Sequence, residues 1–365
     1  MKKNVFDGGS LDEAIQRLPG GKSRMDAYLE AIRQADAAQD NYWRMMFRYS
    51  CCCEATFRDD PPKAIPLAAE FCALFDECAE ALLARSPEGA AEMHLMVMQM
   101  GIDPIVFLPQ ISMEQWETMM EEFYRWVKRY GIGLRTYWWQ MTRFWRYVDR
   151  EKAYEYFQRF WKTGRDGLSD CRACERSYAV QMELMMGNRA AADGYAKPME
   201  QGRIRFCSDT PQLYWLAYLE YALDRGDMTE AAKRASALYR KGNRDKSDLS
   251  YTGAILRCWA DTDPERAVDL FARRLEWSIG MWDQKKVYDF DKGACVCFRR
   301  LSRHQETVRL ELPRSFPLWR EDGAYAAGEL ADWFQAQAAN IGRRFDRRNG
   351  SRCFERDLAA ALAGK

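Results

Sequence analysis

The chain has 365 residues, more than the ~250–300 at which one compact core usually stops growing, so two domains or an elongated array are predicted. Its 47% hydrophobic and 30% charged residues, with a formal net charge of +1, are ordinary for a folded soluble protein. The sequence contains no run of ~20 uncharged apolar residues that would be long enough to cross a bilayer. Residues 1–20 mix acids and bases and lack the apolar segment of a secretory signal, so we expect a cytoplasmic protein whose twelve cysteines are reduced.

Residues 18–23, Leu-Pro-Gly-Gly-Lys-Ser, end like a loop that cradles phosphate with backbone amides and a lysine. Two requirements of such a loop are missing. Gln16 stands where the first glycine belongs, and no strand precedes the segment. We therefore predict a turn at the end of a helix.

A pair of aspartates, Asp59 and Asp60, follows a predicted helix in this aromatic-rich chain. The pair is similar to the aspartates with which class I terpene cyclases hold magnesium against a diphosphate. The chain departs from that pattern at Lys63, where the family has a further acid, and no second metal-binding motif follows. An all-α enzyme with a metal or diphosphate site at Asp59 and Asp60 is kept as an alternative, and a helix boundary is the favoured interpretation.

The methionine-rich stretch 93–100 contains His94, one of only two histidines. Neither histidine belongs to a zinc-protease or di-iron motif, so His94 is predicted to lie in the core or at the edge of a groove. The methionines are expected mainly to fill the core, with an adaptable binding surface as the alternative.

Residues 123–165 carry fifteen aromatic side chains and eleven Lys or Arg against three acids, a local net charge of +8. Within 137–147 the aromatic residues point to every side of a helix, which is more than one helix pair can bury. This basic-aromatic belt is therefore the predicted working surface. A packing role for its rings and binding of single-stranded nucleic acid are the alternatives.

Two cysteine pairs, Cys171-x-x-Cys174 and Cys295-x-Cys297, could in principle supply four thiolates to zinc. The pairs are far apart and lie in predicted helices, whereas zinc sites use pairs on turns. We expect core thiols, no bound metal and no cofactor.

Helical periodicity recurs along nearly the whole chain, and short breakers divide it into pairs of helices that must be antiparallel neighbours. These breakers include Gly131-Ile132-Gly133, Gly187-Asn188, Gly226-Asp227 and Asp263-Pro264. The second helix of four pairs contains an alanine at an equivalent place, spaced 39, 39 and 36 residues apart. A small side chain there lets two helices approach closely. These alanines are Ala153, Ala192, Ala231 and Ala267.

The pair at residues 212–238, with Trp215, the turn Gly226-Asp227 and Ala231 in phase, resembles the tetratricopeptide repeat family. Phe157 and Phe271 follow their alanines by four positions, as in that family. The resemblance implies an all-α, right-handed α-solenoid whose first helices line a concave face. It also implies a protein or peptide partner at the first-helix residues of the belt: Arg135, Trp138, Trp139, Arg143 and Arg146. Because arginine pairs with carboxylates and stacks on rings, that partner is expected to be acidic or aromatic.

We expect one continuous array. Divergent helical pairs occupy 1–130, tetratricopeptide-like repeats 131–309, and a C-terminal cap 310–365, with a long terminal helix at 325–347. The predicted function is non-catalytic binding by an adaptor, a regulator or a bacterial immunity protein. The pI near 7.4 disfavours nucleic acid as the partner.

Overall fold

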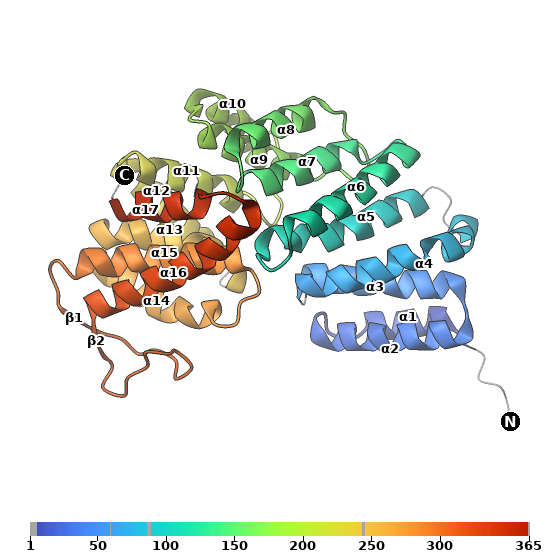
Figure 1. The fold of residues 1–365 in the computed structure, drawn as a ribbon, viewed down its shortest axis with the longest axis horizontal. Helices are drawn as coiled ribbons and strands as arrows, with labels where there is room; N and C mark the ends of the chain where they lie inside the picture. Colours follow the sequence, from blue (N-terminus) through green and yellow to red (C-terminus); the bar gives the residue numbers. More distant parts are fainter. Residues whose placement is uncertain (1–5, 59, 86–88, 243–244, 364–365) are drawn as a thin grey trace. The chain divides into compact units, whose positions relative to one another are not determined.

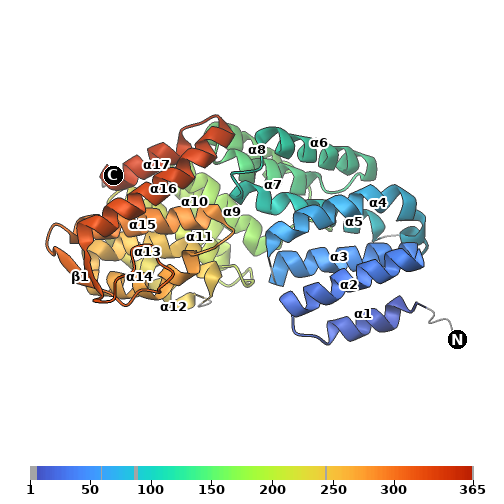
Figure 2. The same cartoon turned by 60° about the horizontal axis from the view of Figure 1, so that its bottom comes forward.

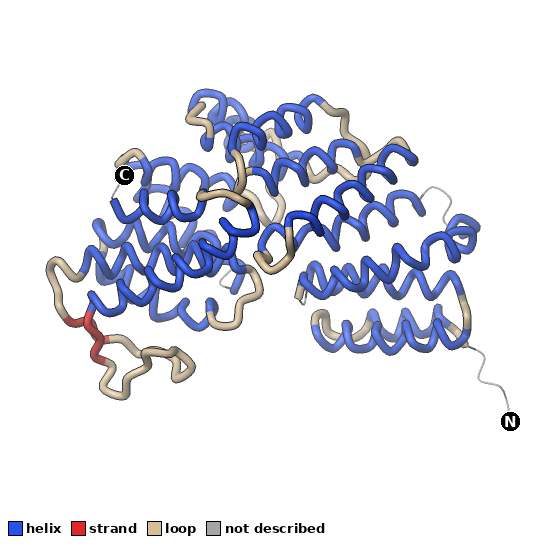
Figure 3. The backbone as a smooth tube through the Cα atoms, in the orientation of Figure 1, coloured by secondary structure: helices blue, strands red, loops and turns tan. Residues whose placement is uncertain are grey.

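The computed structural model describes residues 6–58, 60–85, 89–242 and 245–363, which are overwhelmingly helical (Figures 1 and 3). The longer helices are α1 (Gly8–Gln16), α2 (Lys22–Ala38), α3 (Asn41–Arg58), α4 (Ala64–Arg85), α5 (Ala90–Ile102), α6 (Met113–Tyr130), α7 (Leu134–Trp145), α8 (Arg150–Lys162), α9 (Arg172–Met185), α10 (Arg189–Glu200), α11 (Gln212–Asp224), α12 (Met228–Lys241), α13 (Leu249–Thr262), α14 (Pro264–Ser278), α15 (Gln284–Leu301), α16 (Ala327–Asn349) and α17 (Cys353–Ala363). Three short 3-10 helices are η1 (Pro61–Lys63), η2 (Asp103–Phe107) and η3 (Lys246–Asp248).

The chain divides into two compact units. Unit 1 comprises Met1–Met141 and Arg159–Ser169, and unit 2 comprises Thr142–Gln158 and Asp170–Lys365. The division passes through α7 and α8, so each of these helices contributes to both units.

The predicted breakers fall between helices. Gly131 ends α6 in the left-handed conformation that glycine adopts without strain, and Gly187 and Gly226 have positive φ after α9 and α11. Asp263 caps α14 by accepting from the backbone N–H of Arg266. The sequence thus located the ends of these helices correctly because the capping residues act locally.

In unit 1 the helices from α2 to α6 pack in chain order, each on the next (Figure 2). His94 on α5 is fully buried in this unit and stacks on Phe75 of α4 with ring centroids 3.8 Å apart. Its Nδ1 lies 3.0 Å from the hydroxyl of Tyr130, and Trp126 meets its ring edge to face at 4.5 Å. Burial, with a smaller effect from Arg129, lowers the pKa of His94 to about 4.

In unit 2 the helices pack as antiparallel pairs, α9 with α10, α11 with α12, α13 with α14 and α15 with α16. The alanines predicted at the close approaches are all 0% exposed: Ala153, Ala192, Ala231 and Ala267. Phe157 and Phe271 are buried as well. The expectation that these positions carry packing is therefore confirmed.

The closest approach of two helices in unit 2 joins α13 and α15 at a pair of glycines. A Cβ atom on Gly253 would collide with the backbone carbonyl of Asp289, and one on Gly293 would collide with the backbone of Gly253. The two helices therefore touch backbone to backbone. Both figures show α13, α15 and α16 side by side (Figures 1 and 2).

The C-terminal segment differs from its prediction in two ways. A short antiparallel pair of strands, β1 (Thr307–Arg309) and β2 (Ala324–Ala326), flanks the segment that contains Pro313 and Pro317, with Val308 opposite Tyr325. The terminal helix α16 begins at Ala327 and is followed by a second helix, α17, which the sequence analysis did not separate. Ser351 and Arg352 interrupt the helices after Gly350, which adopts positive φ.

None of the helices in the described part of the chain has the length and apolar character that a bilayer-crossing segment needs.

We predict that replacing Gly253 by alanine destabilises unit 2 by about 1–3 kcal/mol, since the added methyl group meets backbone that cannot rotate away. The predicted value is the net change, in which the steric cost outweighs the gain of up to about 1 kcal/mol that alanine brings to a helix interior relative to glycine. Chemical and thermal unfolding of the full chain measure the change. Gly194→Ala in α10 is the control, because open space surrounds that position, and it is expected to stabilise. Equal effects at both positions would contradict the backbone contact.

We predict that unfolding stability falls by about 3 kcal/mol as the pH drops from about 6.5 to 4, because unfolded His94 takes up a proton that the folded protein excludes. The contribution of neutral His94 to the free energy of unfolding is complete above the pKa of His94 in the unfolded chain. It is lost as the pH falls toward the lower pKa of His94 in the folded protein. His94→Phe is expected to remove this pH dependence, whereas the exposed His304→Gln retains it. If the free energy of unfolding depended on pH in the same way in the wild-type protein and in His94→Phe, His94 would not be the source of the pH dependence.

Candidate functional site

Two of the five predicted binding residues lie inside unit 1. Arg135 is 5% exposed and donates to the backbone carbonyls of Phe160 and Thr163, at the end of α8. Trp139 is 6% exposed and packs on Phe160, with ring centroids 5.5 Å apart. Both side chains therefore stabilise unit 1 from within, and the surface proposed below does not include them.

Trp138 is half-buried in unit 1. Its ring meets Tyr137 edge to face at 4.9 Å, and the guanidinium of Arg159 lies 5.0 Å from its centroid. The arginine thus covers part of an aromatic surface that the sequence assigned to a partner.

The remaining two predicted residues, Arg143 and Arg146, are half-buried in unit 2. Arg146 donates from Nη1 to Oε1 of Gln181 at 3.0 Å and from Nη2 to the hydroxyl of Tyr147 at 2.5 Å. Arg143 interacts electrostatically with Tyr178 on α9. These contacts fix the direction of the Arg146 guanidinium.

Tyr147 joins Arg146 to a second set of polar residues that the sequence analysis did not single out. The ammonium group of Lys285 lies 5.4 Å from the Tyr147 ring centroid and 5.9 Å from that of Tyr288. Lys285 lies on a polar face of α15. The other members of this face follow it by three, four and seven residues and are Tyr288, Asp289 and Lys292.

We call this set, with Asp357 of α17, the α15 network. Lys285 donates to both carboxylate oxygens of Asp289 at 2.7 and 2.6 Å. Lys292 Nζ lies 2.7 Å from Asp357 Oδ2 and 3.8 Å from Asp289 Oδ1. The Tyr288 hydroxyl is within 2.8 Å of both Asp357 Oδ2 and the carbonyl oxygen of Phe354.

The protonation states follow from these contacts. Burial acts to lower the pKa of Lys285, but the Asp289 carboxylate outweighs it and raises that pKa above its ordinary value. Lys292 and the other donors lower the pKa of Asp357 far below its usual range, although burial opposes them. Burial and the negative charge of Asp289 raise the pKa of Glu220 on α11, against the opposing effect of the two lysines.

Contacts between the first and last segments of unit 2 hold this arrangement together. Asn349 at the end of α16 donates to the backbone carbonyl of Tyr147 at 2.9 Å. Cys353 Sγ lies 3.3 Å from the carbonyl of Val148, and the rings of Tyr147 and Phe354 are 5.9 Å apart. Arg146 and the α15 network therefore share one neighbourhood within unit 2.

Chemically, the neighbourhood can bind a charged group. In the α15 network Asp289 and Asp357 are already paired with lysines, so neither carboxylate is free to ligate a cation such as magnesium. Side-chain exposures of 18% for Lys285 and 13% for Asp289 leave these groups accessible but poorly solvated. Charge interactions gain strength in such surroundings.

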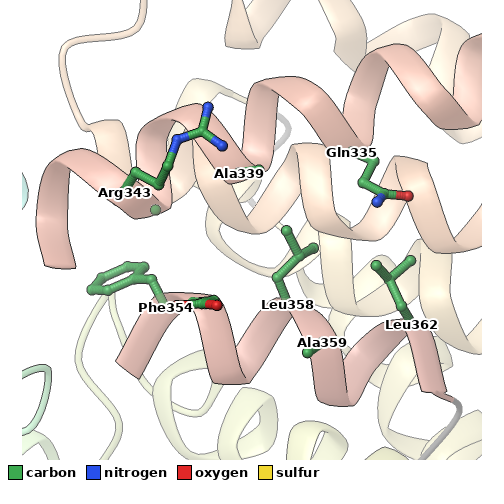
Figure 4. Close-up of a pocket in the computed structure, with 9 residues that line it drawn as sticks. Gln335, Ala339, Arg343, Phe354, Leu358, Ala359 and Leu362 are labelled. Atoms are coloured by element: carbon green, nitrogen blue, oxygen red, sulfur yellow. The ribbon is translucent and has the colours of Figure 1, made fainter. Parts of the chain in front are cut away.

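A separate open cavity of about 210 Å³ lies between α16 and α17 (Figure 4). Leu358 and Leu362 line it from α17, Ala339 faces them from α16, and Arg343 lies at one end. The cavity is chiefly apolar.

The alternative metal or diphosphate site was predicted at Asp59 and Asp60, and Asp59 lies outside the described residues. Asp60 immediately precedes η1, with extended backbone dihedrals. It therefore marks the helix boundary that the sequence favoured.

Spacing is the signal that could have found the α15 network. Lys285, Tyr288, Asp289 and Lys292 recur at helical intervals on a segment that also carries buried Phe290, Ala294 and Phe298. Asp357 and Glu220 gave no such signal, since they lie on other helices far away in the sequence.

Comparison with known proteins finds no match: no family model, no curated protein and no solved structure aligns with the chain. The tetratricopeptide resemblance therefore depends on the residues quoted for it.

We predict that Asp357→Asn destabilises unit 2 by about 1–3 kcal/mol, because it leaves the buried Lys292 ammonium without its nearest counter-charge. The loss of stability is smaller than for a fully buried ion pair because the Asp357 side chain is 39% exposed and water partly screens its charge. Combining it with Lys292→Met should recover part of the loss in a double-mutant cycle of unfolding free energies. Glu355→Gln, in an exposed pair on α17, is the control and should change stability by less than about 0.5 kcal/mol. Additive effects of the two network substitutions would show that the pair is not coupled.

Proposed function

We propose that this protein is a non-catalytic scaffold that binds an acidic segment of a protein or peptide partner through Arg143, Arg146 and the α15 network. The connected path from Gln181 through Arg146 and Tyr147 to Lys285 is the observation that carries the proposal. It places Arg146, from the turn after α7, and the lysines of α15 in one poorly solvated neighbourhood.

The charges favour an acidic ligand. Arg146, Lys285 and Lys292 provide three positive charges, while Asp289 and Asp357 provide two negative ones. Glu220 is a further acid and Arg143 a further cation of this neighbourhood, so one positive charge remains in excess. A ligand carboxylate would therefore improve the local balance, and an arginine held in position by Gln181 and Tyr147 loses little entropy on binding it.

The architecture that fits this role is a right-handed α-solenoid of tetratricopeptide type, with α9, α11, α13 and α15 as the first helices of successive pairs. Such first helices present a continuous inner face to an extended ligand. The packed helix pairs, the buried alanines and the location of Glu220, Lys285 and Lys292 on first helices support this arrangement. Adaptor, regulator and immunity protein are the functional classes that this role includes.

Peptide-display selection against the full-length protein tests the proposal. We expect the selected peptides to be enriched in Asp and Glu, and their affinities can be measured by fluorescence anisotropy. Replacing Arg143 and Arg146 together by glutamate should weaken binding by at least about 100-fold, since two charge-assisted contacts become repulsive. Arg150→Glu, at the exposed start of α8, is the matched control and should change affinity less than about threefold.

Circular dichroism of each variant verifies the fold before affinities are compared. Peptides without acidic residues, or unchanged affinity in a folded double variant, would contradict the proposed site. Tight binding of a single-stranded oligonucleotide that weakens steeply with salt, in preference to any peptide, would instead favour the nucleic-acid alternative.

A further inference from the structure

Three cysteine sulfurs meet at the start of α9 in unit 2. Cys171 is the N-cap residue of that helix, and Cys174 lies in its first turn. Cys207 comes from the loop between α10 and α11. The three Sγ atoms lie within 4.8 Å of one another, and those of Cys174 and Cys207 are 3.3 Å apart.

We propose that Cys171, Cys174 and Cys207 form a binding site for one soft divalent cation of the zinc type. Zinc–sulfur bonds of about 2.3 Å in a tetrahedral site place neighbouring sulfurs roughly 3.8 Å apart. The observed separations bracket that value, so small side-chain rotations are sufficient to complete the coordination.

The start of α9 positions the sulfur of Cys171. Its sulfur accepts from the backbone N–H of Cys174 at 3.4 Å, as the side chain of an N-cap residue does. The Cys-x-x-Cys spacing brings both sulfurs to the same side of the first turn.

Cys207 has its own set of donors. The Thr210 hydroxyl lies 3.5 Å from its sulfur, and that hydroxyl oxygen also accepts from the Cys207 backbone N–H at 2.9 Å. Burial acts to raise the pKa of Cys207, but hydrogen bonds from Thr210, Cys174 and the backbone of residues 209 and 210 lower it overall. Burial and the neighbouring sulfurs raise the pKa of Cys174, so a bound cation would have to displace the proton of that thiol. Such donors are the usual outer partners of a metal-bound thiolate.

The site is open on one side. Cys174 is 8% exposed and Cys207 is half-buried, whereas Cys171 is exposed. Three protein ligands leave a fourth position of a tetrahedral cation for water or an external ligand. The cation would also link α9 to the loop that leads into α11, so its binding should stabilise unit 2.

Titration of the reduced, metal-free full-length protein with Co²⁺ under anaerobic conditions tests the site. We expect one equivalent to bind and to give a sulfur-to-cobalt charge-transfer band, which one equivalent of Zn²⁺ then removes. Each of Cys171→Ser, Cys174→Ser and Cys207→Ser should lose the band, and Cys72→Ser, a half-buried cysteine of unit 1, should retain it.

A second measurement does not depend on the folding of any variant. Zn²⁺ should slow alkylation of these three thiols in the wild-type protein, as mapped by mass spectrometry, and should raise its Tm. Failure of the folded, reduced protein to bind Co²⁺ would overturn the proposal. So would a band that survives in all three serine variants, or protection of other cysteines in place of these.

Discussion

The backbone contact between Gly253 and Gly293 is the constraint on which the arrangement of unit 2 depends. It holds α13 and α15 closer together than any side chain larger than hydrogen would permit. Asp289 lies at this crossing, since its carbonyl oxygen is the atom that a Cβ on Gly253 would meet. A larger residue would push α15 away and would move Lys285 and Lys292 relative to Glu220 and Asp357.

Ion pairs inside a helical protein stabilise little by themselves, because removing charges from water costs about as much as their attraction returns. Their effect on specificity is larger, since a shifted helix would leave a charge unpaired. The bond between Lys292 and Asp357 fixes the position of α17 on α15 in this way. The contacts of Tyr288 with Phe354 and Asp357 add a directional restraint to the same pair of helices.

Features that act over a few residues were predictable from the sequence, as the glycine and aspartate helix ends and the buried Ala192 and Ala231 show. The aromatic excess of residues 123–165 was visible too, but not its distribution between interior and surface. Cations of the same segment cover several of its rings, as Lys152 covers Trp145. The sequence alone does not show which cation lies on which ring. Cys207 and Gly293 could not be found because their partners lie more than thirty residues away, with nothing in the intervening pattern to connect them.

The contact between Asn349 and Tyr147 joins residues 202 positions apart. During synthesis on the ribosome, the segment around Tyr147 leaves the exit tunnel long before α16 and α17 exist. Its half of the interface must therefore remain uncovered until α16 has been made. Completion of unit 2 must consequently wait for α16 and α17, and until then Tyr147 and Val148 lack the contacts that Asn349 and Cys353 supply.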